Sequence, residues 1–293
     1  MVPSVYHGKV RDVYDLGDQL LMVTSDRISA FDRPLGEISG KGEVLNQLAL
    51  FWFDHTADIV PNHVVKRCGP RSTLVKKAQM VPVEVVVRAY LTGSAWKAYR
   101  EGNLIPGLVV PPGYRAHQKL DQPQITPTTK AAVGDHDEPL SGQDVVSRGL
   151  CSQELWSQIE TVAQRLFLRG TEWAVQQGLL LVDTKYEFGL VNGQLTICDE
   201  IHTPDCSRFW FAADYDEAFS SGREPRKLDK EYLRSWLADQ GFSGEGPVPT
   251  IPPKVFEETR KRYVDAYELL TGQAFQFSKL SFEAELASLP YLR

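Results

Sequence analysis

The sequence lacks the features that would place it in or across a membrane. It contains no uninterrupted apolar run near the roughly 20 residues that a membrane-spanning helix needs. Its first seven residues also lack the apolar segment of a secretory signal peptide. We therefore expect a cytoplasmic protein that does not associate with membranes.

Cysteine is scarce, and its spacing excludes the usual metal-finger patterns. No two of the four cysteines form a C-x-x-C pair, and the six histidines include no H-E-x-x-H motif. A zinc site is therefore not expected, and the thiols fit a reducing compartment. The four are Cys68, Cys151, Cys198 and Cys206.

A surplus of positive charge is also missing. The chain has 32 lysines and arginines against 38 acidic residues, a net charge of −6. Nucleic-acid binding requires a basic surface, so we expect no nucleic-acid partner. Local cationic clusters around a small phosphorylated ligand remain compatible with this charge, and no protein partner is indicated.

Hydrophobic periodicity predicts an α+β fold with two parts. An N-terminal antiparallel-sheet domain is expected over residues 1–110, and a larger mixed α/β domain ending in helices over residues 111–293, with a ligand between them. Residues 102–150 show little periodicity, which favours a functional loop. The expected strands cover residues 10–16, 20–25, 73–78, 83–90, 179–191 and 194–201. The expected helices cover residues 43–58, a segment after an N-cap at Ser152, and residues 230–240 and 254–271.

The first charged motif is Gly8-Lys9-Val10-Arg11. On a strand, alternation places Lys9 and Arg11 on one face, where both could meet phosphate oxygens while Gly8 allows a close backbone approach. The motif is not a Walker sequence. A solvated basic strand edge is the alternative interpretation.

The second motif joins a valine-rich strand to a Thr-Gly-Ser turn, from Met80 to Ser94. Arg88 follows the valines and needs a partner, because an unpaired buried guanidinium is costly. That partner is either a carboxylate of the protein or a bound phosphate, which arginine holds with two parallel hydrogen bonds. The Ser94 hydroxyl and the backbone N–H groups of a helix beginning near Gly93 could add hydrogen bonds to a phosphate, but the motif alone does not decide between the two partners.

The third motif is Asp183-Thr184-Lys185-Tyr186-Glu187. Strand alternation puts Asp183, Lys185 and Glu187 on one face and Tyr186 on the other. Carboxylates beside an ammonium group match the needs of Mg²⁺ with a polyphosphate. A solvent-exposed strand face is the alternative.

The fourth motif runs from Cys198 to Arg208. Asp199 is a candidate second Mg²⁺ ligand at the end of a strand, and Arg208 is a candidate second clamp for a phosphate. A capping turn with a surface arginine is the alternative.

The hairpin around Asn192-Gly193 decides whether the two candidate metal ligands share a face. A two-residue turn would pair Val191 with Gln194, whereas a three-residue loop would pair Leu190 with Gln194 and set Lys185 opposite Asp199. We predict the three-residue loop, because it places Glu187 and Asp199 on one face.

Taken in this order, the four motifs resemble those of the phosphoribosylaminoimidazole-succinocarboxamide synthase family. The resemblance extends from Gly8 to Thr271, and three further segments resemble the longer variety of that family. These are residues 25–32, Lys41-Gly42 and the loop at residues 129–138, which includes Asp135 and His136.

The resemblance implies an ATP-dependent ligase with a kinase-like or ATP-grasp-like nucleotide site between the two domains. Its substrates would be ATP, L-aspartate and a carboxyaminoimidazole ribonucleotide, its metal Mg²⁺, and its pathway purine biosynthesis.

The roles that the resemblance implies fall into four groups. Gly8, Lys9, Arg11, Lys185 and the backbone near Met80 would bind ATP. Glu187 and Asp199 would hold the metal. Arg88, Ser94, Asp205, Ser207 and Arg208 would bind the ribonucleotide. Lys130, Asp137, Lys185 and Glu187 would act in catalysis.

Two other functions remain open at this point. One is a different ATP-dependent carboxylate–amine ligase or a small-molecule kinase. The other is a nucleotide-binding module without catalysis, which the intact Lys185, Glu187 and Asp199 disfavour.

Overall fold

The computed structural model describes residues 4–31, 33–103, 105–130, 137–228 and 230–292. A five-stranded antiparallel sheet forms first, in the order β1-β2-β3-β7-β6. The expected hairpin at residues 10–25 is confirmed as β2 and β3. The strands are β1 (Ser4–His7), β2 (Arg11–Asp15), β3 (Gln19–Thr24), β6 (Val64–Arg67) and β7 (Ser72–Lys76). A separate hairpin pairs β4 (Arg27–Ala30) with β5 (Arg33–Glu37).

Helix α1 (Lys41–His55) confirms the expected early helix. Its apolar face, including Trp52, is buried in the core. The Asp26 carboxylate fixes its start, because it accepts hydrogen bonds from the backbone N–H groups of Gly40 and Gly42 at 3.0 and 2.9 Å. A Cβ on Gly42 would lie 2.3 Å from the Thr24 carbonyl oxygen, so this helix start requires glycine.

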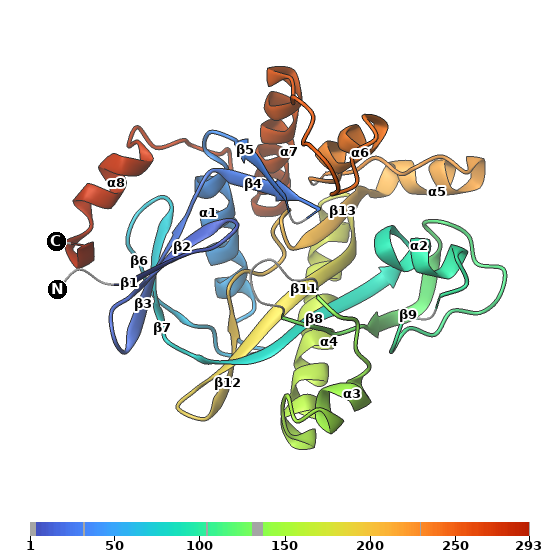
Figure 1. Ribbon diagram of the computed structural model, residues 1–293, viewed down its shortest axis with the longest axis horizontal. Helices are drawn as coiled ribbons and strands as arrows, with labels where there is room; N and C mark the ends of the chain where they lie inside the picture. The colour runs from blue at the N-terminus through green and yellow to red at the C-terminus, as the bar shows by residue number, and fades with distance from the viewer. Residues whose placement is uncertain (1–3, 32, 104, 131–136, 229, 293) are drawn as a thin grey trace.

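The second sheet has six strands and forms the centre of the molecule (Figure 1). Its path is β10-β8-β11-β12, with β9 paired to β8 and β13 to β11. The long helix α4 (Gln153–Gln176) packs against β8 and β11, and Ser152 caps it as expected. The strands are β8 (Gln79–Tyr90), β9 (Lys119–Ile125), β10 (Thr128–Thr129), β11 (Leu179–Val191), β12 (Gln194–Cys198) and β13 (Ser207–Phe211).

The segment at residues 102–150 is more regular than its sequence indicates. It contains β9, β10 and the short helix α3 (Gly142–Ser147). The local pattern of β9, with Pro123 among polar residues, does not favour a strand. Pairing with β8 overrides that preference, and proline is tolerated because β9 lies at an edge of the sheet.

The predicted register of the β11–β12 hairpin is wrong. Val191 pairs with Gln194, so the connection is the two-residue turn. Asn192 and Gly193 both have positive φ, 52° and 78°, which is the conformation that an Asn-Gly hairpin turn favours. Local turn propensity therefore decided this register.

The remaining helices surround the two sheets. Helix α7 confirms the helix expected at residues 254–271 and packs against α1. Helix α8 lies apart from the others, against the N-terminal sheet (Figure 1), where Leu286 and Leu289 pack with Leu21 and Val23. These helices are α2 (Gly93–Arg100), α5 (Ala212–Ser221), α6 (Glu231–Asp239), α7 (Pro253–Thr271) and α8 (Phe282–Ser288), followed by a 3₁₀ turn at Pro290–Leu292.

Arg71 joins α8 to the first sheet and to α1. Its guanidinium contacts Asp26 at 2.5 Å and Glu43 at 3.0 Å. Glu285 of α8 accepts hydrogen bonds from the Arg71 backbone N–H at 3.0 Å and from the Ser72 hydroxyl at 2.6 Å. Arg71, Glu43 and Glu285 are buried, so the loss of one charge would leave its partner buried and unpaired.

Within the described part of the chain, every helix is too short or too polar to cross a membrane.

Candidate active site

Two cavities lie side by side on one face of the central sheet. Cavity I has a volume of about 470 Å³ and is lined by Lys9 of the β1–β2 turn, by Arg11 at the start of β2, and by Glu187 and Asp199. Cavity II has a volume of about 340 Å³ and is lined by the start of α2 and by Arg88 and Arg208. Because the cavities share part of their lining, they adjoin one another. The shared residues are Glu84, Asp137, Lys185, Asp205, Lys230 and Arg234.

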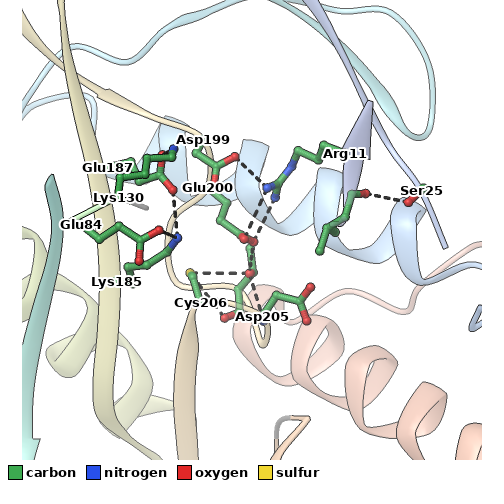
Figure 2. Close-up of polar contacts among 12 residues, drawn as sticks. Arg11, Ser25, Glu84, Lys130, Lys185, Glu187, Asp199, Glu200, Asp205 and Cys206 are labelled. Atoms are coloured by element: carbon green, nitrogen blue, oxygen red, sulfur yellow. Dashed lines mark hydrogen bonds and ion pairs between the residues drawn. The ribbon is translucent and has the colours of Figure 1, made fainter. Parts of the chain in front are cut away.

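A row of alternating charges lies where cavity I meets the sheet (Figure 2). The Lys185 ammonium group donates to Glu84 at 2.6 Å and to Glu187 at 2.9 Å, and Lys130 donates to the other oxygen of Glu187. Burial alone would raise the pKa of Glu187, but Lys185 and Lys130 outweigh it and lower that pKa to about 2. Glu187 is therefore ionised at any physiological pH.

The expected alternation along β11 is confirmed. Asp183 and Lys185 line the cavities, and Glu187 lies on the same side. Tyr186 and Phe188 point the other way and are fully buried. The interpretation of this motif as a solvent-exposed strand face is excluded, because Asp183 and Glu187 are each only 5% exposed.

Arg11 lies between two carboxylates at the start of β2 (Figure 2). It contacts Asp199 at 2.7 Å and Glu200 at 3.1 Å. The strand predicted to carry both cations begins only at Arg11, because residues 8–10 form the turn after β1, closed by the Gly8 N–H bonded to the Arg11 carbonyl at 2.8 Å. Lys9 and Arg11 both line cavity I, but Lys9 lies in the turn.

Asp199 reaches cavity I in a way that strand alternation does not describe. The β11–β12 ladder ends where Glu187 pairs with Cys198, so a regular strand would turn Asp199 away from Glu187. Instead Asp199 has a left-handed backbone with φ of 62°, and its side chain lines the same cavity as Glu187. The consequence expected from a two-residue turn, two carboxylates on opposite faces, therefore does not follow.

The pKa of Asp199 is raised to about 6, chiefly by burial and also by the nearby Glu187 and Glu200, against the lowering effect of Arg11. Burial is thus the main reason that the charged form of Asp199 is disfavoured, and the two neighbouring carboxylates add to this effect. This is the electrostatic environment that a bound cation would relieve.

Arg88 and Arg208 converge on one carboxylate in cavity II. Asp183 accepts from Arg88 at 3.4 Å and also from Arg208. Arg88 therefore has the carboxylate partner that one interpretation of its motif required, while both guanidinium groups still line the cavity. Ser94 and Ser207 lie on the same wall, Ser94 in the first turn of α2.

The sequence did not identify the charged residues that surround Asp205 at the bottom of the site. Lys41 is fully buried at the start of α1 and pairs with Asp205 at 2.8 Å, and Tyr263 of α7 donates to the same carboxylate. Lys230 lies 3.6 Å from Asp205. Lys41 was noted only within a family motif, and no local pattern marks Lys230, because α6 carries it to the site from a distant part of the sequence.

Some expected residues lie elsewhere. Met80 lines neither cavity and lies on β8 beside Gly189, with 39% of its surface exposed. Asp32, Asp135 and His136 lie outside the described residues. Asp137 and Lys130, at the two edges of the undescribed loop, both line cavity I.

The sequence is similar to one family over most of its length. A sequence model of the SAICAR synthetase family matches residues 4–249. The phosphoribosylaminoimidazole-succinocarboxamide synthase of Bacteroides fragilis is 47% identical over 277 residues, which cover 93% of this chain and 88% of the relative. The enzyme of the same name from Legionella pneumophila is 46% identical over 279 residues, covering 93% and 89%. The chain belongs to the SAICAR synthetase family.

Solved structures of the SAICAR synthetase family share this fold. The SAICAR synthase of Saccharomyces cerevisiae, solved as a complex with SAICAR, is 33% identical with a TM-score of 0.81, over 94% of this chain and 97% of that one. A SAICAR synthetase solved with ADP is 27% identical with a TM-score of 0.71, over 94% and 100%. The mixed α+β architecture is therefore that of the family, and the chain is an enzyme, a ligase.

Proposed function

We propose that this SAICAR synthetase joins L-aspartate to 5-amino-1-(5-phosphoribosyl)imidazole-4-carboxylate, using ATP and releasing ADP and phosphate, in purine biosynthesis. The observation that carries the proposal is the pair of adjoining cavities, one lined by cations and carboxylates and the other by two arginines. A ligase that activates one substrate with another must hold both in contact, and the adjoining cavities provide for that. Relatives solved with SAICAR and with ADP support the same pairing of ligands.

Cavity I is the proposed ATP end. Gly8, Lys9, Arg11 and Lys185 would surround the phosphates, and the backbone near Met80 would meet the adenine. The nucleotide would then lie between an N-terminal part at residues 1–110 and a larger part at residues 111–293, in a kinase-like or ATP-grasp-like arrangement. We place the reaction in the cytoplasm.

Mg²⁺ is the proposed metal, with Glu187 and Asp199 as its protein ligands. Carboxylate oxygens are the donors that Mg²⁺ prefers, and the raised pKa of Asp199 fits a nearby cation. The described residues contain no group of three or more His, Cys, Asp or Glu side chains arranged to hold a metal ion, as expected where phosphates and water complete the coordination. When bound, Mg²⁺ would neutralise charge on the transferring phosphoryl group.

Cavity II is the proposed ribonucleotide end. Arg88, Arg208, Ser94 and Ser207 would hold the 5′-phosphate, because guanidinium groups bind phosphate with parallel charge-assisted hydrogen bonds. Asp205 would lie near the aminoimidazole, held ionised by Lys41 and Lys230, which depress its pKa against the effect of burial.

The reaction would take two steps, phosphorylation of the ribonucleotide carboxylate and attack by the aspartate amine. A carboxylate is a poor electrophile, so a carboxylate oxygen of the ribonucleotide first takes the γ-phosphoryl group and ADP leaves. The aspartate amine then attacks the acyl carbon, loses a proton, and phosphate departs. Lys185 and Lys130 stabilise the negative charge that develops during transfer, and Lys130 and Asp137 would close over the joined substrates.

The test is ADP release with ATP, L-aspartate and the imidazole ribonucleotide, omitting each in turn. We expect release to require all three, and the succinocarboxamide product to appear in equal amount. Release that persists without aspartate or without the ribonucleotide would instead indicate a kinase or a different ligase.

A further inference from the structure

The loop between β12 and β13, residues 199–206, brings several charged groups to the two cavities. Asp199 and Glu200 begin it and line cavity I, and Asp205 near its end lines both cavities. Arg208 follows on β13 and lines cavity II. The positions of the candidate metal ligand and of the phosphate clamp therefore both depend on how this loop is held.

His202, in the middle of the loop, is buried on the opposite side of the sheet from the cavities. Its side chain is fully buried, and its Nε2 lies 2.5 Å from the hydroxyl of Tyr186. The ring meets Trp52 edge-on at 4.6 Å between ring centroids. A Cβ on Gly170 of α4 would lie 2.3 Å from the ring, so α4 leaves room for it only because residue 170 is glycine.

This arrangement retains two unfavourable features. His202 has a left-handed backbone with φ of 51°, which costs free energy for any residue other than glycine. Its Nδ1 is buried and has no hydrogen-bond partner among the described residues. Burial lowers the pKa of the ring to about 3, so it is neutral. Strained residues persist only where the surrounding structure holds them, so the contacts of this ring fix its position.

The anchored ring is linked to the cavity groups by Thr203, the next residue. The Thr203 hydroxyl donates to Glu200, and its carbonyl accepts from the backbone N–H of Ser207 at 2.9 Å. Tyr186 lies between Lys185 and Glu187 on β11. One strand thus presents Lys185 and Glu187 to the cavity from one face and holds the loop through Tyr186 from the other.

We infer that Tyr186, His202 and Gly170 form an anchor that positions Asp199 and Arg208 for the reaction. These three are positioning residues, because none of them lines either cavity. The anchor sets the separation between Glu187 on the strand and Asp199 on the loop. Misplacement of reacting groups by about 1 Å lowers rates by about 100-fold, so a small movement of this ring has a large effect. The inference rests on the proposed function.

The decisive variant is Gly170→Ala, which adds one methyl group against the ring and touches no cavity. Alanine ordinarily favours a helix over glycine, so helix propensity alone predicts no loss. We expect kcat to fall by about 10-fold or more at a temperature where circular dichroism shows a folded protein. Gly178→Ala is the control: it lies just after the same helix, and its Cβ would touch nothing within 4 Å. Gly178 has a positive φ of 73°, so this control carries a backbone strain that Gly170→Ala does not. Its kcat should equal that of the wild type.

The contact between residue 170 and the His202 ring is tested by His202→Asn. Asparagine tolerates a positive φ but lacks the imidazole ring. The double variant Gly170→Ala/His202→Asn should be no worse than His202→Asn alone, because the added methyl group then has no ring to displace. Tyr186→Phe provides a third variant that removes only the hydroxyl and should lower kcat in the same direction.

A second readout does not depend on ligation. ADP binding is measured by calorimetry with and without Mg²⁺, and the gain in affinity from Mg²⁺ should be smaller in Gly170→Ala than in the wild type. The inference is overturned if the single variants keep the kcat and the Mg²⁺ dependence of the wild type and lower only Tm. It is also overturned if the kcat losses of Gly170→Ala and His202→Asn multiply in the double variant. A wild-type protein without ligase activity would overturn the proposed function instead, and the Mg²⁺ readout would still decide the anchor.

Discussion

At the scale of single residues, Glu187 is the carboxylate that pairs with both Lys130 and Lys185 in cavity I. Replacing it with glutamine keeps the shape but removes the negative charge that two lysines share. We expect Glu187→Gln to lower kcat by about 100-fold or more, because a preorganised electrostatic contact is lost. ADP release measures the effect, and circular dichroism checks the fold.

A matched control is Glu224→Gln, an exposed glutamate that pairs with Lys227 at 2.8 Å. It should leave kcat unchanged. A Glu187→Gln enzyme as active as this control would show that Glu187 does not hold the metal.

Arg208 tests the assignment of cavity II. Each charge-assisted contact to a phosphate is worth about 1.5–3 kcal/mol, or about 10- to 100-fold in affinity. We expect Arg208→Ala to weaken binding of the imidazole ribonucleotide by that factor and to leave ATP binding unchanged, as measured by calorimetry.

Arg223→Ala is its control, since Arg223 pairs with Asp214 at 2.9 Å on the exposed surface. It should change neither affinity. Loss of ATP affinity in Arg208→Ala, with ribonucleotide affinity preserved, would mean that the two cavities are assigned the wrong way round.

At the scale of elements, the start of α2 shapes the arginine clamp. Gly93 has φ of 56°, and a Cβ there would lie 2.7 Å from the Arg208 guanidinium. We expect Gly93→Ala to weaken ribonucleotide binding about 10-fold, because the clamp must move. Gly102→Ala has a similar φ of 74° and an open Cβ position. It should cost about 1 kcal/mol of stability without loss of affinity. Equal affinities in the two variants would show that backbone strain, not the Arg208 contact, is what Gly93 avoids.

Local patterns predicted elements where one short segment carried all the information. The alternation of Asp183, Lys185 and Glu187 and the Ser152 cap needed nothing beyond their neighbours. β9 was missed because pairing with β8 creates it. The hairpin register was predicted wrongly because the expected metal site was given more weight than the turn propensity of Asn-Gly. Asp199 nevertheless lines the cavity, because its backbone has a positive φ that no strand pattern indicates.

Site residues were predictable from the sequence only where a charged residue interrupts an otherwise apolar segment. Lys185 and Arg88 are cations within apolar strands, and both line the cavities. Lys41 and Lys230 lie at helix starts, where charged residues are common, and only the packing of α1 and α6 brings them to Asp205. No distance along the sequence indicates that contact.

At the scale of the whole molecule, buried histidine links stability to pH. His63 is 5% exposed, and burial lowers its pKa to about 3 from an unfolded value near 6.5. The unfolded chain therefore takes up a proton that the folded protein does not, so the free energy of unfolding falls as pH drops below about 6.5. His202 acts in the same direction, whereas Asp199, with its raised pKa, acts in the opposite one.

The contribution of His63 is isolated by comparison with His63→Asn. Between about pH 6 and pH 4, the unfolding free energy of the wild type should fall with a slope steeper by up to about 1.4 kcal/mol per pH unit, the effect of one proton. Urea unfolding across this range measures both slopes. Parallel slopes would mean that His63 is protonated in the folded protein.

The link between Arg71 and α8 has a consequence for how the chain folds while it is being synthesised. Glu285 is translated 214 residues after Arg71. At about 5–20 residues per second, the two are separated by about 10–40 s of synthesis. The N-terminal sheet, first to emerge from the ribosome, thus waits for one of the last helices to cover Leu21 and Val23 and to bind the Arg71 backbone. Until then the growing chain exposes an apolar face, and it is during this interval that a chaperone would recognise the nascent enzyme.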